Sequence, residues 1–128
     1  MRPDRIVIVE DDPAMCEALR RLLTTAGFRV SGYPSAEALL ESDAVSDAAC
    51  LVLDVNLPGI SGFELHRRLV ASGSRPRVVF ITAHEDDQMR DEAMHAGAEA
   101  FFTKPFPGRQ LIEILRSILG TSHREVRP

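Results

Sequence analysis

Four short apolar runs in this chain each lead to polar side chains that could do chemistry. In chain order, 6–9 precedes Glu10 and Asp11, 51–53 precedes Asp54, 78–81 precedes Thr82, and 100–102 comes just before Lys104. A carboxylate can bind a divalent metal ion or attack phosphorus, and hydroxyl and ammonium groups can neutralise phosphoryl oxygens. These residue types therefore predict phosphoryl chemistry if the fold brings them to one place.

The spacing of the runs predicts a parallel β-sheet that would do so. Each run is short and rich in β-forming residues, and a helix-length segment separates it from the next. We expect strands at 6–9, 28–33, 51–53, 78–81 and 99–103. The carboxyl ends of parallel strands share one edge of the sheet, and α/β proteins bind ligands at that edge.

The segments between the strands carry signals for five helices. The expected starts are Pro13 in a first turn, a cap at Ser35, a capping box of Ser61 and Glu64, a cap at Asp86 or Asp87, and Gly108. The expected ends of the first, third, fourth and fifth helices lie near glycines 27, 73, 97 and 120. We interpret the acidic stretch 41–47 as a loop.

This alternation predicts an α/β fold of the flavodoxin-like kind. Its doubly wound sheet would have five parallel strands in the order 2-1-3-4-5, with five helices distributed over both faces. The first and third strands are neighbours in that order. Glu10, Asp11 and Asp54 would then meet in one crevice.

Length and composition set outer limits on the function. The 128 residues suit one domain, which we place at 1–120, with a polar tail or the start of a linker at 121–128. The 19 acidic and 15 basic residues give a net charge of −4 without a basic stripe, which argues against nucleic-acid binding through this domain. No apolar stretch has the length of a membrane span, so we expect a cytoplasmic protein without membrane contact. Cys16 and Cys50 are expected to be buried, and His66, His95 and His123 to lie on the surface.

The three carboxylates favour a divalent metal ion. Gathered carboxylates raise one another's pKa unless a cation neutralises them, and Mg²⁺ prefers carboxylate and carbonyl oxygens. The simpler alternative is that Asp11 and Asp12 only cap the first helix, where acidic residues are favoured. Asp54 argues for the metal site, because a buried strand has no structural reason to end on a charge.

Asp54 could also act as a nucleophile toward phosphorus and form an acyl phosphate. Lys104 would supply counter-charge to that adduct, and Thr82 would supply a hydroxyl donor. Taken singly, a lysine is usually exposed to solvent and a threonine at a strand end usually only packs. Their expected position at the same edge as Asp54 indicates a shared site.

Four segments of the chain resemble the signature segments of bacterial two-component response-regulator receiver domains. They are Val-Glu-Asp-Asp at 9–12, Leu-Asp-Val-Asn-Leu-Pro-Gly-Ile-Ser-Gly at 53–62, Ile-Thr-Ala at 81–83 and Phe-Thr-Lys-Pro-Phe at 102–106. The segments occur in the family's order, and the resemblance covers residues 5–120. Segments 33–37 and 104–106 are most similar to receivers that precede helix-turn-helix transcription factors of the nitrogen-fixation type, which makes transcription regulation the implied output.

The resemblance implies that Asp54 is the phospho-acceptor of a phosphorelay. It would take the phosphoryl group from a phosphohistidine on a sensor histidine kinase or a phosphotransfer protein. Asp11, Asp54 and the main-chain carbonyl of Asn56 would bind Mg²⁺, with Glu10 in the second position of the acidic pair. Such a receiver is no enzyme in the ordinary sense, because it catalyses only its own phosphorylation and dephosphorylation.

The remaining implied roles belong to residues around the acceptor. Lys104 would pair with the phosphoryl oxygens, and the Lys104–Pro105 bond is expected to be cis. Thr82 and Phe101 would form the switch, with the aromatic ring moving inward as the hydroxyl moves toward the phosphoryl group. The switch would alter the face built by the fourth helix, fifth strand and fifth helix, for partner binding or for homodimerisation on phosphorylation. The rim of the site would be formed by Asn56, Ala83 and His84.

Three alternatives compete with a phosphorylated receiver. A dehalogenase-type phosphatase wants a second Asp two residues after the nucleophile, where this chain has Asn56. A flavodoxin-like nucleotide binder needs a loop rich in Gly, Ser or Thr after the first strand, where this chain has acids. A receiver-like module that binds proteins without being phosphorylated is the third. The sequence leaves open the kinase, the stimulus, the output target, the oligomeric state, the phosphoryl lifetime and whether the chain is a stand-alone protein or a fragment.

Overall fold

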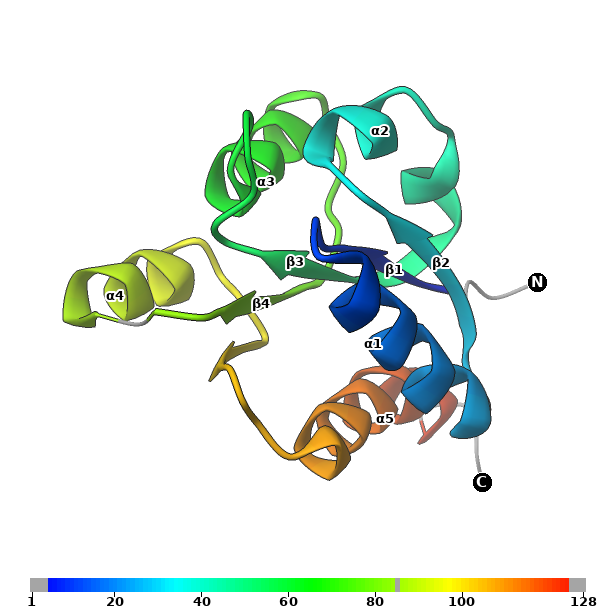
Figure 1. Cartoon of the computed structure of the whole chain (residues 1–128). Coiled ribbons are helices and arrows are strands. Elements are labelled where there is room, and N and C mark those ends of the chain that lie inside the picture. The colour runs from blue at the N-terminus through cyan, green and yellow to red at the C-terminus, as the bar shows by residue number, and fades with distance from the viewer. Residues whose placement is uncertain (1–4, 85, 125–128) are drawn as a thin grey trace.

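The computed structural model describes residues 5–84 and 86–124, and the side chains of 121–124 are left out of the description. Strands and helices alternate along the chain (Figure 1). The elements are β1 (Arg5–Val9), α1 (Pro13–Thr25), β2 (Arg29–Tyr33), α2 (Ala36–Leu40), a 3₁₀ turn η1 (Ala44–Asp47), β3 (Ala48–Asp54), α3 (Gly62–Ala71), β4 (Val78–Thr82), α4 (Asp87–His95), β5 (Ala100–Thr103) and α5 (Gly108–Arg124). None of the helices in this described part is long and apolar enough to cross a membrane.

The five strands form one parallel sheet in the order β2-β1-β3-β4-β5, which confirms the predicted fold. The register fixes which residues meet at the carboxyl edge. Val9 is paired with Leu53, so the residues that follow β1 lie beside Asp54. Asp54 is in turn paired with Ile81 of β4, the residue before Thr82.

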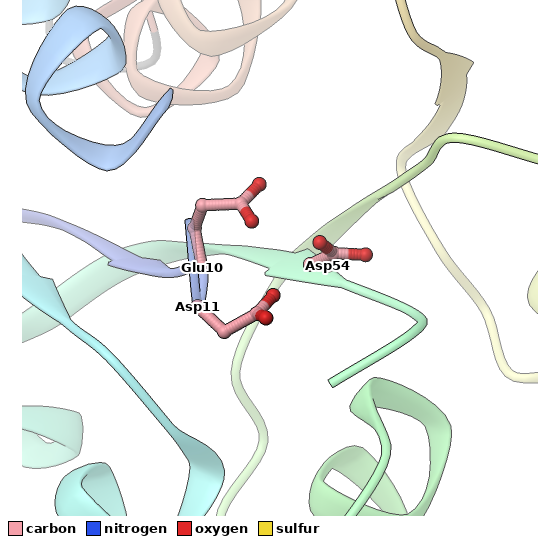
Figure 2. A group of neighbouring side chains, drawn as sticks. All are labelled: Glu10, Asp11 and Asp54. Carbon is pink, nitrogen blue, oxygen red and sulfur yellow. The ribbon is translucent and has the colours of Figure 1, made fainter. Parts of the chain in front are cut away.

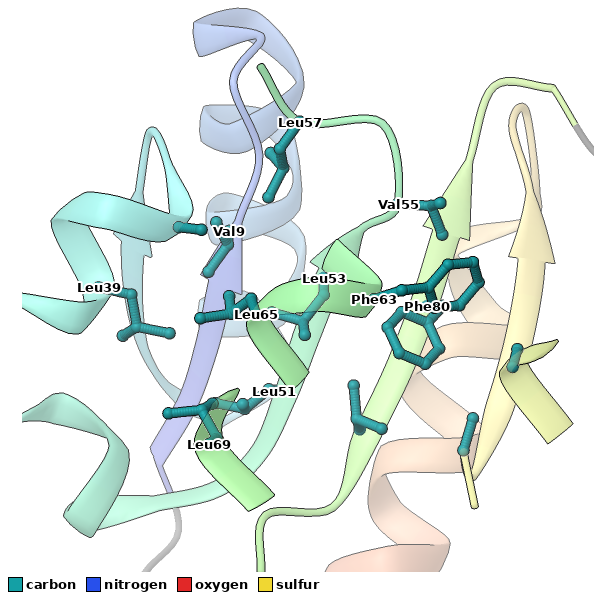
Figure 3. Close-up of a cluster of buried hydrophobic side chains, with 14 of the residues drawn as sticks. Val9, Leu39, Leu51, Leu53, Val55, Leu57, Phe63, Leu65, Leu69 and Phe80 are labelled. Atoms are coloured by element: carbon teal, nitrogen blue, oxygen red, sulfur yellow. The ribbon is translucent and has the colours of Figure 1, made fainter. Parts of the chain in front are cut away.

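Alternate side chains of each strand enter two separate apolar cores, one on each face of the sheet. Ile6, Ile8 and Val52 pack against α1 and α5. Their sequence neighbours point to the opposite face, where the larger core lies under α2, α3 and α4, as Figures 1 and 3 show. Each fully buried aliphatic or aromatic side chain stabilises the fold by about 1.5–3 kcal/mol. The carboxyl edge is therefore carried by a rigid, doubly covered platform.

Side-chain oxygens cap four helices near the predicted positions. Asp12, Ser35, Ser61 and Asp86 each accept main-chain N–H groups from the first turn that follows. The predicted capping box at α3 is only half formed. Ser61 accepts from the Glu64 N–H, but among the described residues the Glu64 carboxylate pairs with Arg67 and Arg68 and does not return to Ser61.

Helices α1, α3 and α4 end near the predicted glycines, since each stops two residues before a glycine of positive φ. Helix α5 instead continues through Gly120 to Arg124, because a glycine inside a helix costs about 1 kcal/mol but does not terminate it. The stretch 41–47, predicted as a loop, contains the 3₁₀ turn at Ala44–Asp47.

Two burial predictions were wrong. His66 was expected on the surface, but it is buried, and its ring packs nearly perpendicular to the Phe80 ring with the ring centroids 5.9 Å apart. Burial lowers the pKa of His66, and the nearby Arg67 charge lowers it further. Cys16 is half-buried rather than buried, whereas Cys50 is fully buried as predicted and burial raises its pKa to about 12. His95 is exposed as expected, and the His123 side chain lies outside the described residues.

Candidate functional site

Three carboxylates meet where β1 and β3 end side by side. Glu10, Asp11 and Asp54 each offer an oxygen within 4.8 Å of the other two, and Figure 2 shows the three side chains directed toward one another. Glu10 and Asp54 are almost completely buried, at 1% and 4% exposure, and Asp11 is exposed. The parallel register thus produces the acidic crevice that the strand order predicted.

Lys104 brings a positive charge to the two buried carboxylates. Its Nζ lies 2.7 Å from Glu10 Oε1 and 3.2 Å from Asp54 Oδ2. The main chain holds it there, because the Lys104 N–H donates to the Thr82 carbonyl at 2.7 Å and the following peptide bond to Pro105 is cis, as expected. Burial opposes the charged form of Lys104, but the contacts with Glu10 and Asp54 outweigh it and raise the pKa of Lys104.

The ionised form of Glu10 remains unfavourable in the folded protein despite its contact with Lys104. Burial raises the pKa of Glu10 most strongly, the hydrogen bond from Lys104 opposes the shift, and the Asp54 carboxylate adds to it. The net effect is a raised pKa, so the folded site disfavours the ionised form of Glu10. Three converging carboxylate oxygens, two of them buried, form a hard donor set that fits a divalent cation such as Mg²⁺.

Asn56 links the Asp54 carboxylate to the Thr82 hydroxyl. Its main-chain N–H donates to Asp54 Oδ1 at 2.9 Å, and its side-chain Nδ2 donates to Thr82 Oγ1 at 2.8 Å. Thr82, which is fully buried, also donates its hydroxyl to the His84 carbonyl at 3.0 Å and accepts from the His84 N–H at 3.2 Å. The hydroxyl is therefore held by Asn56 and His84, and a movement toward Asp54 requires it to exchange these partners.

A cleft of about 410 Å³ opens over these groups. Its lining includes Glu10, Asp11, Asp54, Asn56, Ala83, His84 and Lys104. The structure thus brings the predicted acceptor, acids, lysine and rim residues to one cavity, large enough to admit a small anion beside Asp54.

The two adjacent phenylalanines of β5 point to opposite faces of the sheet. Phe101 is buried in the larger core, and the guanidinium carbon of Arg90 in α4 lies 5.1 Å from its ring centroid. Phe102 enters the other core and stacks on Phe106 at 5.1 Å. The ring of the predicted switch residue Phe101 therefore already points inward in this structure.

Sequence reasoning missed the contact of Arg90 with Phe101. The two residues belong to different elements, and no motif or spacing connects them. It also missed the direct pairing of Lys104 with Glu10, since the lysine was assigned to the phosphoryl oxygens alone.

Comparison with known proteins gives a consistent result. A family model described as response regulator receiver domain matches residues 6–116. The transcriptional regulatory protein FixJ of Azorhizobium caulinodans is 39% identical over 120 residues, which cover 94% of this chain and 57% of FixJ. The response regulator protein TmoT of Ectopseudomonas mendocina is 40% identical over 114 residues, covering 89% of this chain and 52% of TmoT. The chain thus spans about half the length of these relatives.

Solved structures agree with the sequence matches. A crystal structure of FixJ-N is 36% identical with a TM-score of 0.80, and the match covers 92% of this chain and 94% of that one. The BeF₃-activated DrrB receiver domain is 28% identical with a TM-score of 0.82, covering 94% of this chain and 99% of that one.

Proposed function

The chain belongs to the response regulator receiver domain family, and we propose that it accepts a phosphoryl group on Asp54 from a phosphohistidine of a sensor histidine kinase or a phosphotransfer protein. In the transfer, an Asp54 carboxylate oxygen forms the new bond to phosphorus while the bond from phosphorus to the histidine nitrogen breaks. The observation that carries the proposal is the position of Asp54, which lies beside Glu10 and Asp11, contacts Lys104 and lines an open cleft.

Glu10, Asp11, Asp54 and the main-chain carbonyl of Asn56 would hold Mg²⁺. When bound, the ion neutralises charge on the phosphoryl oxygens, whose loose transition state is stabilised mainly by positioning and charge. Asp54 would be oriented by the Asn56 N–H and by Lys104. Lys104 would pair with a phosphoryl oxygen of the product from the place where it now contacts Asp54 Oδ2.

Phosphorylation would act on Thr82 and Phe101. The Thr82 hydroxyl would leave Asn56 and His84 to donate to a phosphoryl oxygen. The Phe101 ring, which already points inward, would shift further into the vacated space. This rearrangement would alter the face formed by α4, β5 and α5, for partner binding or homodimerisation. We place the receiver at 1–120, with a polar tail or the start of a linker at 121–128, in a cytoplasmic protein. We propose transcription regulation as the output, because FixJ is a transcriptional regulatory protein.

The test is phosphorylation by a small phosphodonor. The parent and the Asp54→Asn variant are incubated with acetyl phosphate, with and without Mg²⁺, and their intact masses are measured. We expect one added phosphoryl group on the parent, only when Mg²⁺ is present, and none on the variant. An adduct that forms without Mg²⁺, or that forms equally on Asp54→Asn, contradicts the proposal.

A further inference from the structure

The segment Tyr33–Glu37 touches both of the segments that supply the acidic cluster. At one end, the Tyr33 carbonyl accepts the main-chain N–H of Glu10 at 3.1 Å. At the other end, Glu37 Oε2 accepts the main-chain N–H of Ile60 at 3.1 Å, in the loop that follows Asp54. Between the two, Ser35 caps α2 through the Ala38 N–H at 3.0 Å, which fixes the helix turn that carries Glu37.

The Glu37 carboxylate lies directly against the turn of the β3–α3 loop. Gly59 has a φ of +75°, and a Cβ added to it would lie 2.6 Å from Glu37 Oε2. A side chain at this position would push the flexible carboxylate aside, and the positive φ is itself unfavourable for residues other than glycine. The turn and the carboxylate fit one another closely, although Glu37 itself is exposed.

The same loop is held from the inside against Asp54. A Cβ added to Gly62 would collide with the Asp54 carbonyl oxygen, and the Gly62 N–H donates to the Val55 carbonyl at 3.0 Å. The loop 55–61 is thus fixed at its base by the Gly62 contact and at its outer turn by Glu37. Asn56, whose N–H orients Asp54, lies between these two anchors.

We propose that Glu37 is a positioning residue for the acidic cluster, because segment 33–37 holds the Glu10 segment through Tyr33 and the Asn56 loop through Glu37 at a fixed separation. This inference rests on the proposed Mg²⁺ site. Glu37 is not among the described residues that line the cleft, so it would act on the site through its contacts with the loop at Gly59 and Ile60. Without these contacts the loop that carries Asn56 samples more positions, and the metal binds to fewer of them.

Substitutions at Glu37 separate this role from a general effect of its charge. An acidic residue in the first turn of α2 also interacts favourably with the helix dipole. Glu37→Asp keeps that charge but shortens the side chain by one methylene, so it should lose the contact with Ile60. Glu37→Gln loses the charge but keeps the length and an acceptor oxygen. Glu37→Ala removes both features, and Glu41→Ala is the matched control, since Glu41 is an exposed acid at the end of the same helix.

The experiment is a Mg²⁺ titration of each full chain followed by ¹H–¹⁵N NMR, with amide exchange of Ile60 measured before metal is added. The net worth of one hydrogen bond predicts that Glu37→Ala and Glu37→Asp bind Mg²⁺ about fivefold more weakly than the parent, with faster Ile60 exchange. Glu37→Gln and Glu41→Ala should stay within about twofold of the parent in both measurements.

The outcomes distinguish this inference from the proposed function. If the parent binds Mg²⁺ and Glu37→Ala binds it equally well, the positioning role is refuted and the metal site stands. Faster Ile60 exchange with unchanged metal affinity also refutes it, because the contact then exists without bearing on the site. If Glu37→Asp binds Mg²⁺ as tightly as the parent and Glu37→Gln does not, the charge of residue 37 is responsible and the positioning role is refuted. A parent that binds no Mg²⁺ overturns the metal site, and the inference with it.

Discussion

Glu10 is the residue at which metal binding and stability should conflict most. The carboxylate oxygens lie within 4.8 Å of one another, and at that limit and an effective dielectric constant of 20 two unit charges repel by about 3.5 kcal/mol. Opposite charges 2.7 Å apart attract by about 6 kcal/mol. Glu10 has two acidic neighbours and one lysine, so the summed repulsion of at least about 7 kcal/mol exceeds the attraction. Burial disfavours the ionised carboxylate further, which agrees with the raised pKa of Glu10.

We therefore expect Glu10→Gln to stabilise the metal-free protein by about 1 kcal/mol at pH 8, or about 4 °C in Tm. The glutamine keeps an oxygen for Lys104 or for the Asp12 N–H, which Glu10 Oε2 now accepts at 3.1 Å. Lys104 also retains Asp54 as a partner. The gain comes from removing a buried charge that the fold tolerates poorly without a cation.

The raised pKa of Glu10 also predicts how the stability difference between the parent and Glu10→Gln changes with pH. Because the folded-state pKa of Glu10 is raised, the unfolded chain loses this proton first as the pH rises. The parent therefore loses stability relative to Glu10→Gln as the pH rises through the folded pKa of Glu10, and the difference is complete above it. At acidic pH, where Glu10 is protonated in both states, the two proteins should have nearly equal stability.

Urea unfolding in EDTA, repeated with excess Mg²⁺, measures these effects. A ligand that binds only the folded state stabilises it in proportion to the logarithm of its concentration over Kd, so Mg²⁺ should stabilise the parent more than Glu10→Gln. The control is Glu113→Gln, which removes an exposed charge on α5. A Glu10→Gln protein that is less stable than the parent in EDTA at pH 8 would refute the reasoning, as would an equal gain from Mg²⁺ in both proteins.

Three further substitutions test single contacts. Asn56→Ala removes the hydrogen bond that Asn56 donates to the Thr82 hydroxyl, so phosphorylation by acetyl phosphate should become about fivefold faster. Intact mass measures the rate, and a slower reaction contradicts the idea that Asn56 restrains Thr82. Arg90→Ala should lower the free energy of unfolding by about 0.5–1 kcal/mol, because the guanidinium covers the Phe101 ring, and an unchanged urea midpoint argues against that contact. The pKa of His66 is lowered in the folded protein, so the unfolded chain takes up a proton first as the pH falls below about 6.5. The free energy of unfolding of the parent should therefore fall there, and that of His66→Leu should not. Parallel pH profiles of the two free energies contradict this prediction.

The positions of the main site residues followed from the sequence because parallel strands impose them. Once 6–9 and 51–53 are neighbouring strands, Glu10 and Asp54 must end at one edge, and no side-chain detail is needed. The burial of His66 could also have been predicted. It lies three residues after Phe63 and three before Leu69, on the apolar stripe of α3, and it was misplaced because its residue type was weighed above its position.

The hydrogen bonds that side chains form with residues far away in the sequence could not be predicted in this way. Asn56 reaches Thr82 across 26 residues, and Glu37 reaches Ile60 across 23. Each contact depends on a loop conformation and a side-chain rotamer, and neither is indicated by a periodic pattern in the sequence. These contacts decide how firmly the predicted residues are held, which strand order alone cannot specify.

The charges of the site give a reason why the proposed receiver would use both a lysine and a divalent ion. Three carboxylates and one ammonium group leave two negative charges in the crevice, and a divalent cation balances them. Phosphorylation replaces the single charge of Asp54 with the nearly double charge of a phosphoryl group, so the balance fails again by about one charge. A hydrogen-bond donor that turns toward the phosphoryl oxygens would stabilise this extra charge. Thr82 has a fully buried hydroxyl bonded to Asn56, so under the proposed function the need for such a donor would couple phosphorylation of Asp54 to the proposed Thr82 switch.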